Sequence, residues 1–267
     1  MEIIEEDVTY TSSDGTELHA FIVRPQNSGQ YPGIIVIHEI WGLNDQVRGV
    51  ARRYAGQGYV VLAPHLFSRQ GEILNEENIK RAMKPLFSLP REARSDPSAL
   101  QSLMENMEET DRQVVQILFA GRQSLEPNIL EDAIASYQYI YNLSFVRGDR
   151  IGVTGFCFGA GLAFQVSTLL PFSASVIFYG ANPKPLESVS KISGPVLAFY
   201  AGEDDMVDAG IAALVKVMIK YKKTFAMKLF EGVQHAFFNE TSSVYNSSAA
   251  EDAWEMALAF FNRYLKD

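Results

Sequence analysis

Cysteine is almost absent from this chain, which has one among its 267 residues. A single cysteine cannot form an internal disulfide, so a disulfide-stapled secreted scaffold is excluded. Histidine is nearly as scarce, with four copies, and no Cys/His cluster has the spacing of a metal site. We therefore expect a chain that folds without covalent cross-links and works without a metal or other cofactor.

Positive charge and long apolar runs are also scarce. Lys and Arg number 23 against 32 Asp and Glu, a net charge of -9, which argues against the basic surface that nucleic-acid binding requires. No apolar run approaches the roughly 20 residues that span a bilayer, and the start "MEIIEEDVTY" lacks the features of a secretory signal. We expect a cytoplasmic protein whose partner is a small molecule, either a monomer or a small homo-oligomer.

Apolar residues, by contrast, are plentiful at 47% of the chain. Short apolar runs alternate with helical spacing, for example at residues 45–57 and from about residue 248. Most of these runs are continuously apolar, as in a parallel sheet covered on both faces, whereas the first alternates and suits an edge hairpin. The runs are "LHAFIVRP", "GIIVIHE", "YVVLAP", "RIGVTGF", "ASVIFYG", "PVLAFYA" and "FAMKLFEG". We predict an α/β fold with a mostly parallel central sheet and helices on both faces.

The region from about residue 69 to residue 129 interrupts this alternation. It contains polar helical segments, helix-breaking prolines at positions 85, 90 and 97, and charged stretches such as "EILNEENIKR". No linker has the composition of a flexible domain boundary. We expect a single domain over residues 1–267 with a helical excursion at about 69–129, which either shapes the mouth of a pocket or is a plain crossover.

The single cysteine, Cys157, lies between an apolar run and a helical pattern, in "GFCFG". A lone cysteine is more often a small buried hydrophobic residue than a reactive one. This position, however, matches a nucleophile elbow, in which flanking glycines permit a tight strand-to-helix turn that exposes the central side chain. The helix N-terminus that follows favours the thiolate, which is the attacking form. Cys157 is therefore a candidate nucleophile.

Two further candidates follow Cys157 along the chain. Asp204 comes after the run "PVLAFYAG", and His235 comes after "FAMKLFEG". Taken singly, Asp204 is equally consistent with a helix start, and His235 with an ordinary loop histidine. The order of nucleophile, acid and histidine is nevertheless that of α/β-hydrolases. Asp204 is preferred to Asp205 because it lies nearer the end of its strand.

In the stretch "IVIHEIWGLND", the apolar strand ends at His38 and Glu39. Because position 42 is glycine, this is not the H-E-x-x-H pattern of zinc proteases. A carboxylate at the end of an apolar strand, opposite the elbow, is instead a candidate for controlling the protonation of the thiol. The alternative is that Glu39 is a solvated strand end.

Together, "HEIWGLN", "APHLFSR", "GFCFGA", "AGEDDMV" and "QHAFFN" resemble the dienelactone hydrolase family over essentially the whole chain. The resemblance implies an α/β-hydrolase fold. It also implies that Cys157, His235 and Asp204 form a catalytic triad.

The same resemblance implies supporting roles for residues near the cysteine. Glu39 would interact with the resting thiol of Cys157 and help it ionise when substrate arrives, and the backbone amides of Ile40 and Phe158 would form an oxyanion hole. In the lactonases of the family an arginine also holds the carboxylate that corresponds to Glu39. Asn239 stands at that arginine position here, so we expect Glu39 to be less restrained.

Candidate substrate contacts are Arg69, Trp41 and Asn239. The family arginine that Asn239 replaces helps to bind a substrate carboxylate, and His65 replaces an aspartate common in the family. These departures bear on the choice of substrate more than on the cysteine chemistry.

Three functions remain open on the sequence alone. The leading one is a cysteine-dependent hydrolase of small lactones or activated esters that acts through an acyl-enzyme. A broader carboxylesterase or thioesterase would use the same triad. In a non-catalytic binding protein, Cys157 would be a redox-sensitive thiol.

Overall fold

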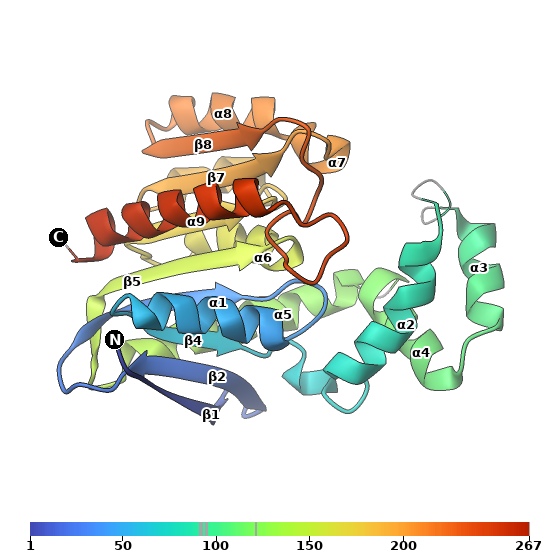
Figure 1. Cartoon of the computed structure of the whole chain (residues 1–267), viewed down its shortest axis with the longest axis horizontal. Helices are drawn as coiled ribbons and strands as arrows, with labels where there is room; N and C mark the ends of the chain where they lie inside the picture. Colours follow the sequence, from blue (N-terminus) through green and yellow to red (C-terminus); the bar gives the residue numbers. More distant parts are fainter. Residues whose placement is uncertain (91–92, 94–95, 121, 267) are drawn as a thin grey trace.

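An eight-stranded sheet runs through the centre of the computed structural model, which describes residues 1–90, 93, 96–120 and 122–266 (Figure 1). The strand order is β1-β2-β4-β3-β5-β6-β7-β8. Strands β3 to β8 are parallel, while β2 pairs antiparallel with both β1 and β4. The strands are β1 Ile3–Thr11, β2 Glu17–Pro25, β3 Tyr31–Ile37, β4 Val60–Pro64, β5 Val146–Phe156, β6 Ala174–Phe178, β7 Val196–Ala201 and β8 Phe225–Phe230.

Helices cover both faces of this sheet. Successive residues of a strand point to opposite faces, so Ile35 packs in one apolar cluster and Ile34 in the other. The first face is covered by α5 (Arg122–Tyr141), α6 (Phe158–Ser167) and α8 (Ile211–Lys220), and the second by α1 (Asp45–Gly56) and α9 (Ser247–Phe261). The remaining short elements are α7 Asp205–Asp208, 3₁₀ turns Ser68–Gln70 and Leu186–Lys191, and π-helical turns Gln116–Ala120 and Asn262–Lys266. The predicted α/β fold is confirmed.

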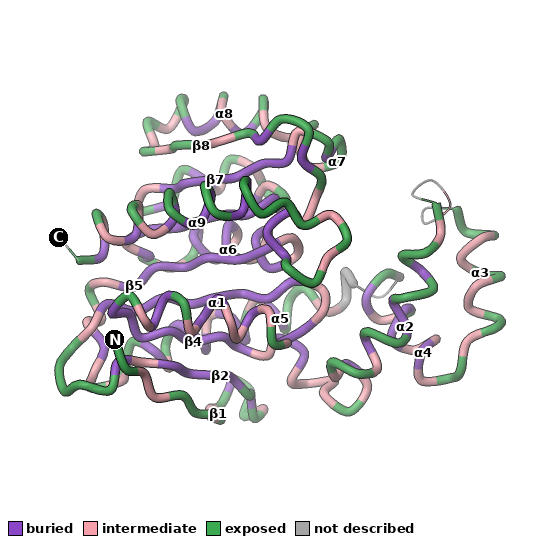
Figure 2. Tube along the Cα trace, viewed as in Figure 1, coloured by how far each residue is buried: buried purple, intermediate pink, exposed green. Residues whose placement is uncertain are grey.

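The excursion forms α2 (Glu76–Ser88), α3 (Pro97–Glu105) and α4 (Glu109–Val115), which extend to one side of the sheet in Figure 1. Apolar side chains on α2 and α4 are buried in the same cluster as the first face of the sheet, whereas α3 has no fully buried residue (Figure 2). An ion pair of 2.7 Å between Arg81 and Asp111 joins α2 to α4. The excursion therefore shares its core with the sheet.

One expected helix breaker does not break a helix. Pro85 lies inside α2, although proline removes one helical hydrogen bond. The helix continues because Ile79, Met83 and Leu86 bury one of its faces on the core, and this packing outweighs the local cost. Pro97, by contrast, occupies the first turn of α3, where proline fits well.

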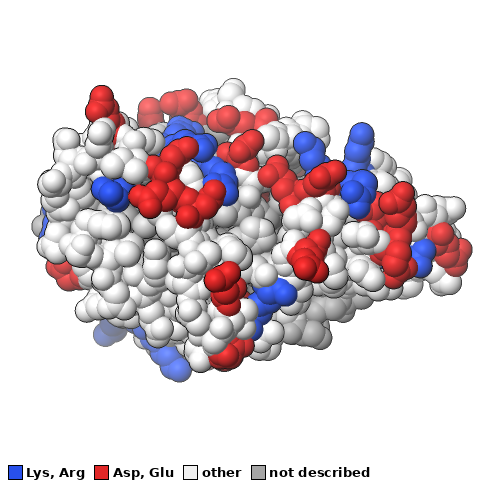
Figure 3. Space-filling model, turned by 90° about the horizontal axis from the view of Figure 1, so that it is seen from below, with Lys and Arg blue, Asp and Glu red and all other residues white. Residues whose placement is uncertain are grey.

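Strand β1 was absent from the sequence prediction. It forms an edge of the sheet, and ion pairs Arg48–Asp7 (2.8 Å) and Arg52–Glu5 (2.6 Å) connect it to α1. Acidic and basic side chains are interspersed on the face seen from below (Figure 3). Among the helices of the described ranges, none has both the length and the apolar character needed to cross a membrane.

Candidate active site

Cys157 occupies a strained turn between β5 and α6. Its backbone has a φ of 53°, which is rare for a residue with a side chain. A Cβ at Gly155 would lie 2.3 Å from the Gly159 carbonyl oxygen, and a Cβ at Gly159 would lie 2.2 Å from that of His38. Both flanking positions therefore require glycine, and the turn has the geometry of a nucleophile elbow.

His235 and Asp204 meet at the same edge of the sheet. Asp204 follows β7 and is buried, and His235 lies in the loop after β8. The Nδ1 atom of His235 is hydrogen-bonded to Oδ2 of Asp204. Burial by itself would lower the pKa of His235, but hydrogen bonds to Asp204 and Cys157, together with their charges, raise it to about 10. The three predicted residues are thus brought together, with the imidazole suited to carry a proton beside the sulfur.

Glu39 is a buried carboxyl group at the end of β3. Its Oε2 accepts a hydrogen bond of 2.6 Å from the Asn239 amide, and its Oε1 accepts one of 3.2 Å from the Tyr179 hydroxyl. Burial raises the pKa of Glu39, although these two hydrogen bonds and the nearby charge of His235 partly oppose the shift. Glu39 is therefore not a solvated strand end.

Asn239 is hydrogen-bonded to Glu39, and the expectation that it restrains Glu39 less than the family arginine stays a prediction. A neutral amide supplies a short hydrogen bond at the position of the family arginine. The Asn239 oxygen is also engaged, since it accepts from the backbone and hydroxyl of Thr241. With 4% of its surface exposed, Asn239 is a partner of Glu39, and its predicted contact with substrate stays a prediction.

Tyr179 was missed by the sequence prediction. It directly follows β6, has a φ of 43°, and its ring centroid lies 4.9 Å from that of His235. Burial, followed by the neighbouring charges of Glu39 and Cys157, raises the pKa of Tyr179 well above its usual value, so the hydroxyl remains a donor to Glu39. The sequence signal that could have identified Tyr179 was its hydroxyl group at the end of β6, the strand that pairs with the elbow strand β5.

The peptide between Glu39 and Ile40 is held by His38. The backbone N–H of Leu66 donates to Nε2 of His38 at 3.0 Å, so the ring proton resides on Nδ1, which donates to the Glu39 carbonyl at 2.6 Å. Because a trans peptide is planar, fixing the Glu39 carbonyl also fixes the direction of the Ile40 N–H. Phe158 is the first residue of α6, directly after Cys157.

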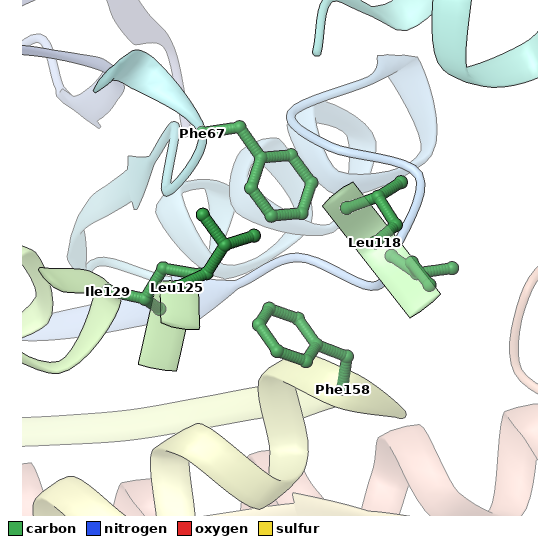
Figure 4. Close-up of a pocket in the computed structure, with 6 residues that line it drawn as sticks. Phe67, Leu118, Leu125, Ile129 and Phe158 are labelled. Atoms are coloured by element: carbon green, nitrogen blue, oxygen red, sulfur yellow. The ribbon is translucent and has the colours of Figure 1, made fainter. Parts of the chain in front are cut away.

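Two hollows lie beside these groups, on opposite faces of the sheet. The first has an empty volume of about 220 Å³ and only carbon side chains around it (Figure 4). It is lined by Ile40, Phe67, Leu118, Leu125, Ile129 and Phe158. The second, of about 270 Å³, lies behind Glu39 and is lined by Glu39, Asn44, Gln46, Val47, Val50, Phe156, Tyr179, Phe238 and Asn239.

The sequence profile described as "Dienelactone hydrolase family" matches residues 18–265. This chain belongs to the dienelactone hydrolase family. A "Putative carboxymethylenebutenolidase" from Saccharolobus solfataricus is 43% identical to it over 263 residues, which cover 98% of this chain and all of the relative. Dienelactone hydrolases act on ester or lactone bonds, so this chain is a hydrolase of such bonds, and the non-catalytic alternative is set aside.

Solved structures of dienelactone hydrolase relatives share the fold. A "Putative Dienelactone Hydrolase" from Klebsiella pneumoniae superposes with a TM-score of 0.73 at 23% identity, covering 99% of this chain and 100% of the other. A dienelactone hydrolase-like promiscuous phosphotriesterase from metagenomic libraries has a TM-score of 0.75 at 20% identity, covering 98% of both chains.

Arg69 and Trp41 were also predicted to contact the substrate of this dienelactone hydrolase, which stays a prediction, and the structure shows what each side chain touches. The Arg69 guanidinium forms a bidentate contact with the buried Asp132 carboxylate, at 2.8 and 2.9 Å, and pairs with Asp14 at 2.6 Å. It is thus occupied by acidic partners of its own and is left out of the proposed site. Trp41 is half-buried and packs on Phe87 of α2, with ring centroids 5.1 Å apart.

In the part of the chain that the structure describes, no group of three or more His, Cys, Asp or Glu side chains is arranged to hold a metal ion. The expectation of a cofactor-free enzyme stays a prediction.

Proposed function

We propose that this chain is a cysteine-dependent hydrolase of small lactones or activated esters, with Cys157 as nucleophile, His235 as proton carrier and Asp204 as the orienting carboxylate. The observation that carries the proposal is the elbow itself, where a cysteine with positive φ stands between two glycines that no other residue can replace. The hydrogen bond between His235 and Asp204 supports it. The single cysteine fits a reducing compartment, so we place the enzyme in the cytoplasm.

In this mechanism the Cys157 sulfur attacks as the thiolate beside a protonated His235, and the raised pKa of His235 favours that protonated ring. In the first half-reaction the sulfur bonds to the substrate carbonyl carbon, and the carbonyl electron pair moves onto oxygen. The N–H groups of Ile40 and Phe158 donate to this oxyanion, and each such donor is typically worth about 3 kcal/mol of barrier. The carbon–oxygen bond to the leaving group then breaks, and His235 gives its proton to the departing oxygen.

The second half-reaction releases the acyl group from sulfur. His235, now neutral, accepts a proton from water while the water oxygen attacks the thioester carbon. Collapse of this second oxyanion breaks the carbon–sulfur bond and restores the thiolate beside the protonated imidazole. Asp204 holds the ring in the tautomer that keeps Nε2 available for both proton transfers.

Glu39 is proposed to set the charge balance of the pair formed by Cys157 and His235. Its carboxylate lies close enough to His235 for that cation to oppose the burial-driven rise of its own pKa. An ionised Glu39 therefore favours the imidazolium, and through it the thiolate. A protonated Glu39 withdraws that support.

The deciding experiment uses p-nitrophenyl acetate and intact-protein mass spectrometry. We expect a burst of p-nitrophenol, equal to the enzyme concentration, together with one acetyl adduct on the peptide that contains Cys157. Cys157→Ala should show neither, and prior alkylation with iodoacetamide should remove both. Near-normal turnover by a folded Cys157→Ala protein would refute the proposal.

Cys157→Ser provides a matched control for the nucleophile. Serine keeps a hydroxyl at the elbow, but a hydroxyl is much less acidic than a thiol with an ordinary pKa of about 8.5. We expect severe loss of acylation with the fold unchanged, because His235 would have to remove the proton during attack.

A broader carboxylesterase or thioesterase at the same site is the second candidate. The apolar hollow beside Ile40 and Phe158 favours it, since such a lining suits an acyl chain. Comparing an unsubstituted lactone with an acyl thioester of equal length separates the two activities.

A further inference from the structure

The apolar hollow begins at the two residues proposed to hold the oxyanion. The Phe67 and Phe158 rings lie across it from one another, with centroids 6.1 Å apart and planes inclined by 30° (Figure 4). Leu118 closes one side, and Leu125 and Ile129 of α5 close the other. Phe158 directly follows Cys157 in the chain, so the hollow adjoins the elbow.

The strand order determines which part of a substrate points into the apolar hollow. Ile40 follows β3 and Phe67 follows β4, on one side of the elbow strand β5. His235 follows β8, on the other side of β5. The leaving group must lie toward His235 to receive a proton, so the acyl group lies toward β3 and β4.

The lining also decides the charge that the hollow accepts. All six side chains are apolar, and burying an unpaired carboxylate among them would cost several kcal/mol. The Arg69 guanidinium is paired with Asp132 and Asp14, so its charge does not serve as a partner for a substrate carboxylate in the hollow. Burial lowers the pKa of His38 to about 3 and also lowers that of His65, so both nearby imidazoles are neutral at pH 7.

We propose that this hollow is the acyl subsite and that it takes a short, uncharged apolar group, either the alkyl chain of an ester or the acyl-side carbons of an unsubstituted lactone ring. The proposal rests on the function proposed above. The hollow is narrow, with the Phe67 and Phe158 ring centroids 6.1 Å apart, so the group that enters it is small. Because Leu118 comes from the excursion and Ile129 from its end, the excursion sets the acyl preference.

The first test compares p-nitrophenyl esters on the wild-type enzyme. Each methylene that enters the hollow should raise kcat/KM about fourfold, giving at least a tenfold rise from acetate to pentanoate. The mono-p-nitrophenyl ester of glutarate has the same length as pentanoate but ends in a carboxylate. We expect its kcat/KM to be at least about 30-fold below that of the pentanoate ester.

The second test moves a charge into the hollow. Leu125→Lys places an ammonium where the glutarate carboxylate would lie, and should reduce the preference for pentanoate over glutarate to less than about tenfold. Asn128→Lys is the matched control, because Asn128 is exposed on the same helix and does not line the hollow. It should keep the wild-type preference, and thermal unfolding of both variants reports whether they are folded.

The outcomes separate the subsite from the chemistry. A flat chain-length series, or equal rates on pentanoate and glutarate, with acetate still acylating Cys157, overturns the subsite alone. If no ester acylates Cys157, the proposed function is wrong and the subsite falls with it. If Leu125→Lys does not fold, the wild-type comparison of pentanoate with glutarate decides.

Discussion

The two hollows beside the Glu39–Ile40 peptide are similar in volume, about 220 and 270 Å³, but are built from different groups. On the α5 side the walls are carbon. On the α1 side a carboxyl, a phenol and an amide are linked by hydrogen bonds among Glu39, Tyr179 and Asn239. With the function proposed above, we expect the apolar face to bind substrate and the polar face to control protonation. Substitutions on the apolar side should then alter substrate preference, and those on the polar side should alter pH dependence.

The largest effect is expected at the carboxylate that orients the histidine. Asp204→Asn should lower kcat/KM by about 10² to 10³-fold, because an amide no longer holds His235 in the required tautomer. Asp205 is exposed and one residue further along, so Asp205→Asn should change kcat/KM by less than about threefold. The opposite ranking would assign the acid to Asp205.

A smaller effect is expected on the polar side. Glu39→Gln should lower kcat/KM by about 10 to 100-fold. It should also abolish the acid limb of the pH profile, which is the fall in kcat/KM at low pH, since an amide cannot ionise. In the wild type this limb should lie above the ordinary pKa of glutamate, because burial raises the pKa of Glu39 and activity falls as the pH drops through that value.

Tyr179→Phe sharpens the same prediction. The hydroxyl of Tyr179 stabilises the Glu39 carboxylate, so its removal should raise the pKa of Glu39 further and move the acid limb to higher pH. A limb that stays in place in both variants would show that Glu39 does not govern the pH profile.

On the apolar side, Leu118→Ala should change preference without changing pH dependence. Truncation enlarges the hollow, so the best acyl chain should lengthen and the rate on hexanoate relative to acetate should rise about four- to tenfold. The acid limb should match the wild type. A shifted limb would break the division between the two faces. Because Leu118 is buried, the unfolding free energy of the Leu118→Ala variant should also be about 2 to 5 kcal/mol below that of the wild type.

The smallest effect concerns stability in acid. The pKa of His38 is about 3 in the folded state, against about 6.5 when unfolded, so its contribution is present above pH 6.5 and is lost as the pH falls. His38→Gln removes this titration. Its difference in unfolding free energy from the wild type should therefore shift by about 2 kcal/mol between pH 7 and pH 5, in favour of the variant. A constant difference in urea titrations would contradict this sign.

The same residue allows an activity control. The amide N–H of an asparagine lies near the position of Nδ1, which bonds to the Glu39 carbonyl. The amide group of a glutamine instead lies near the position of Nε2, which bonds to the Leu66 N–H. If the bond to the Glu39 carbonyl orients the Ile40 N–H, His38→Asn should keep more of kcat than His38→Gln.

The catalytic edge could be predicted from the sequence because strand ends are marked by abrupt changes in residue type. Cys157 and Asp204 follow apolar runs, His235 follows a run interrupted by Lys228, and parallel strands bring such positions to one edge. Tyr179 escaped prediction because an aromatic residue extends an apolar run instead of ending it. Strand β1 escaped because its burial is partial, and Val8 and Tyr10 alone carry the alternation.

The contacts of long polar side chains were the least predictable part. Arg69 lies in the segment expected to approach substrate, but its partners are at positions 14 and 132, far away in the sequence. Sequence spacing carries no signal for pairs of that kind. The same holds for Asn239, whose neighbour Glu39 is 200 residues distant.

The Arg69 cluster connects the wall of the apolar hollow to the N-terminal hairpin. Ser12, at the end of β1–β2 pairing, and Asp14 in the hairpin turn are joined through Arg69 to Asp132. Asp132 lies one helical turn beyond Ile129, which forms part of the pocket wall. Through these contacts the hairpin helps to fix the position of α5 relative to the sheet. A loop-length change between β1 and β2 could then retune which acyl groups fit, without any alteration near the sulfur atom.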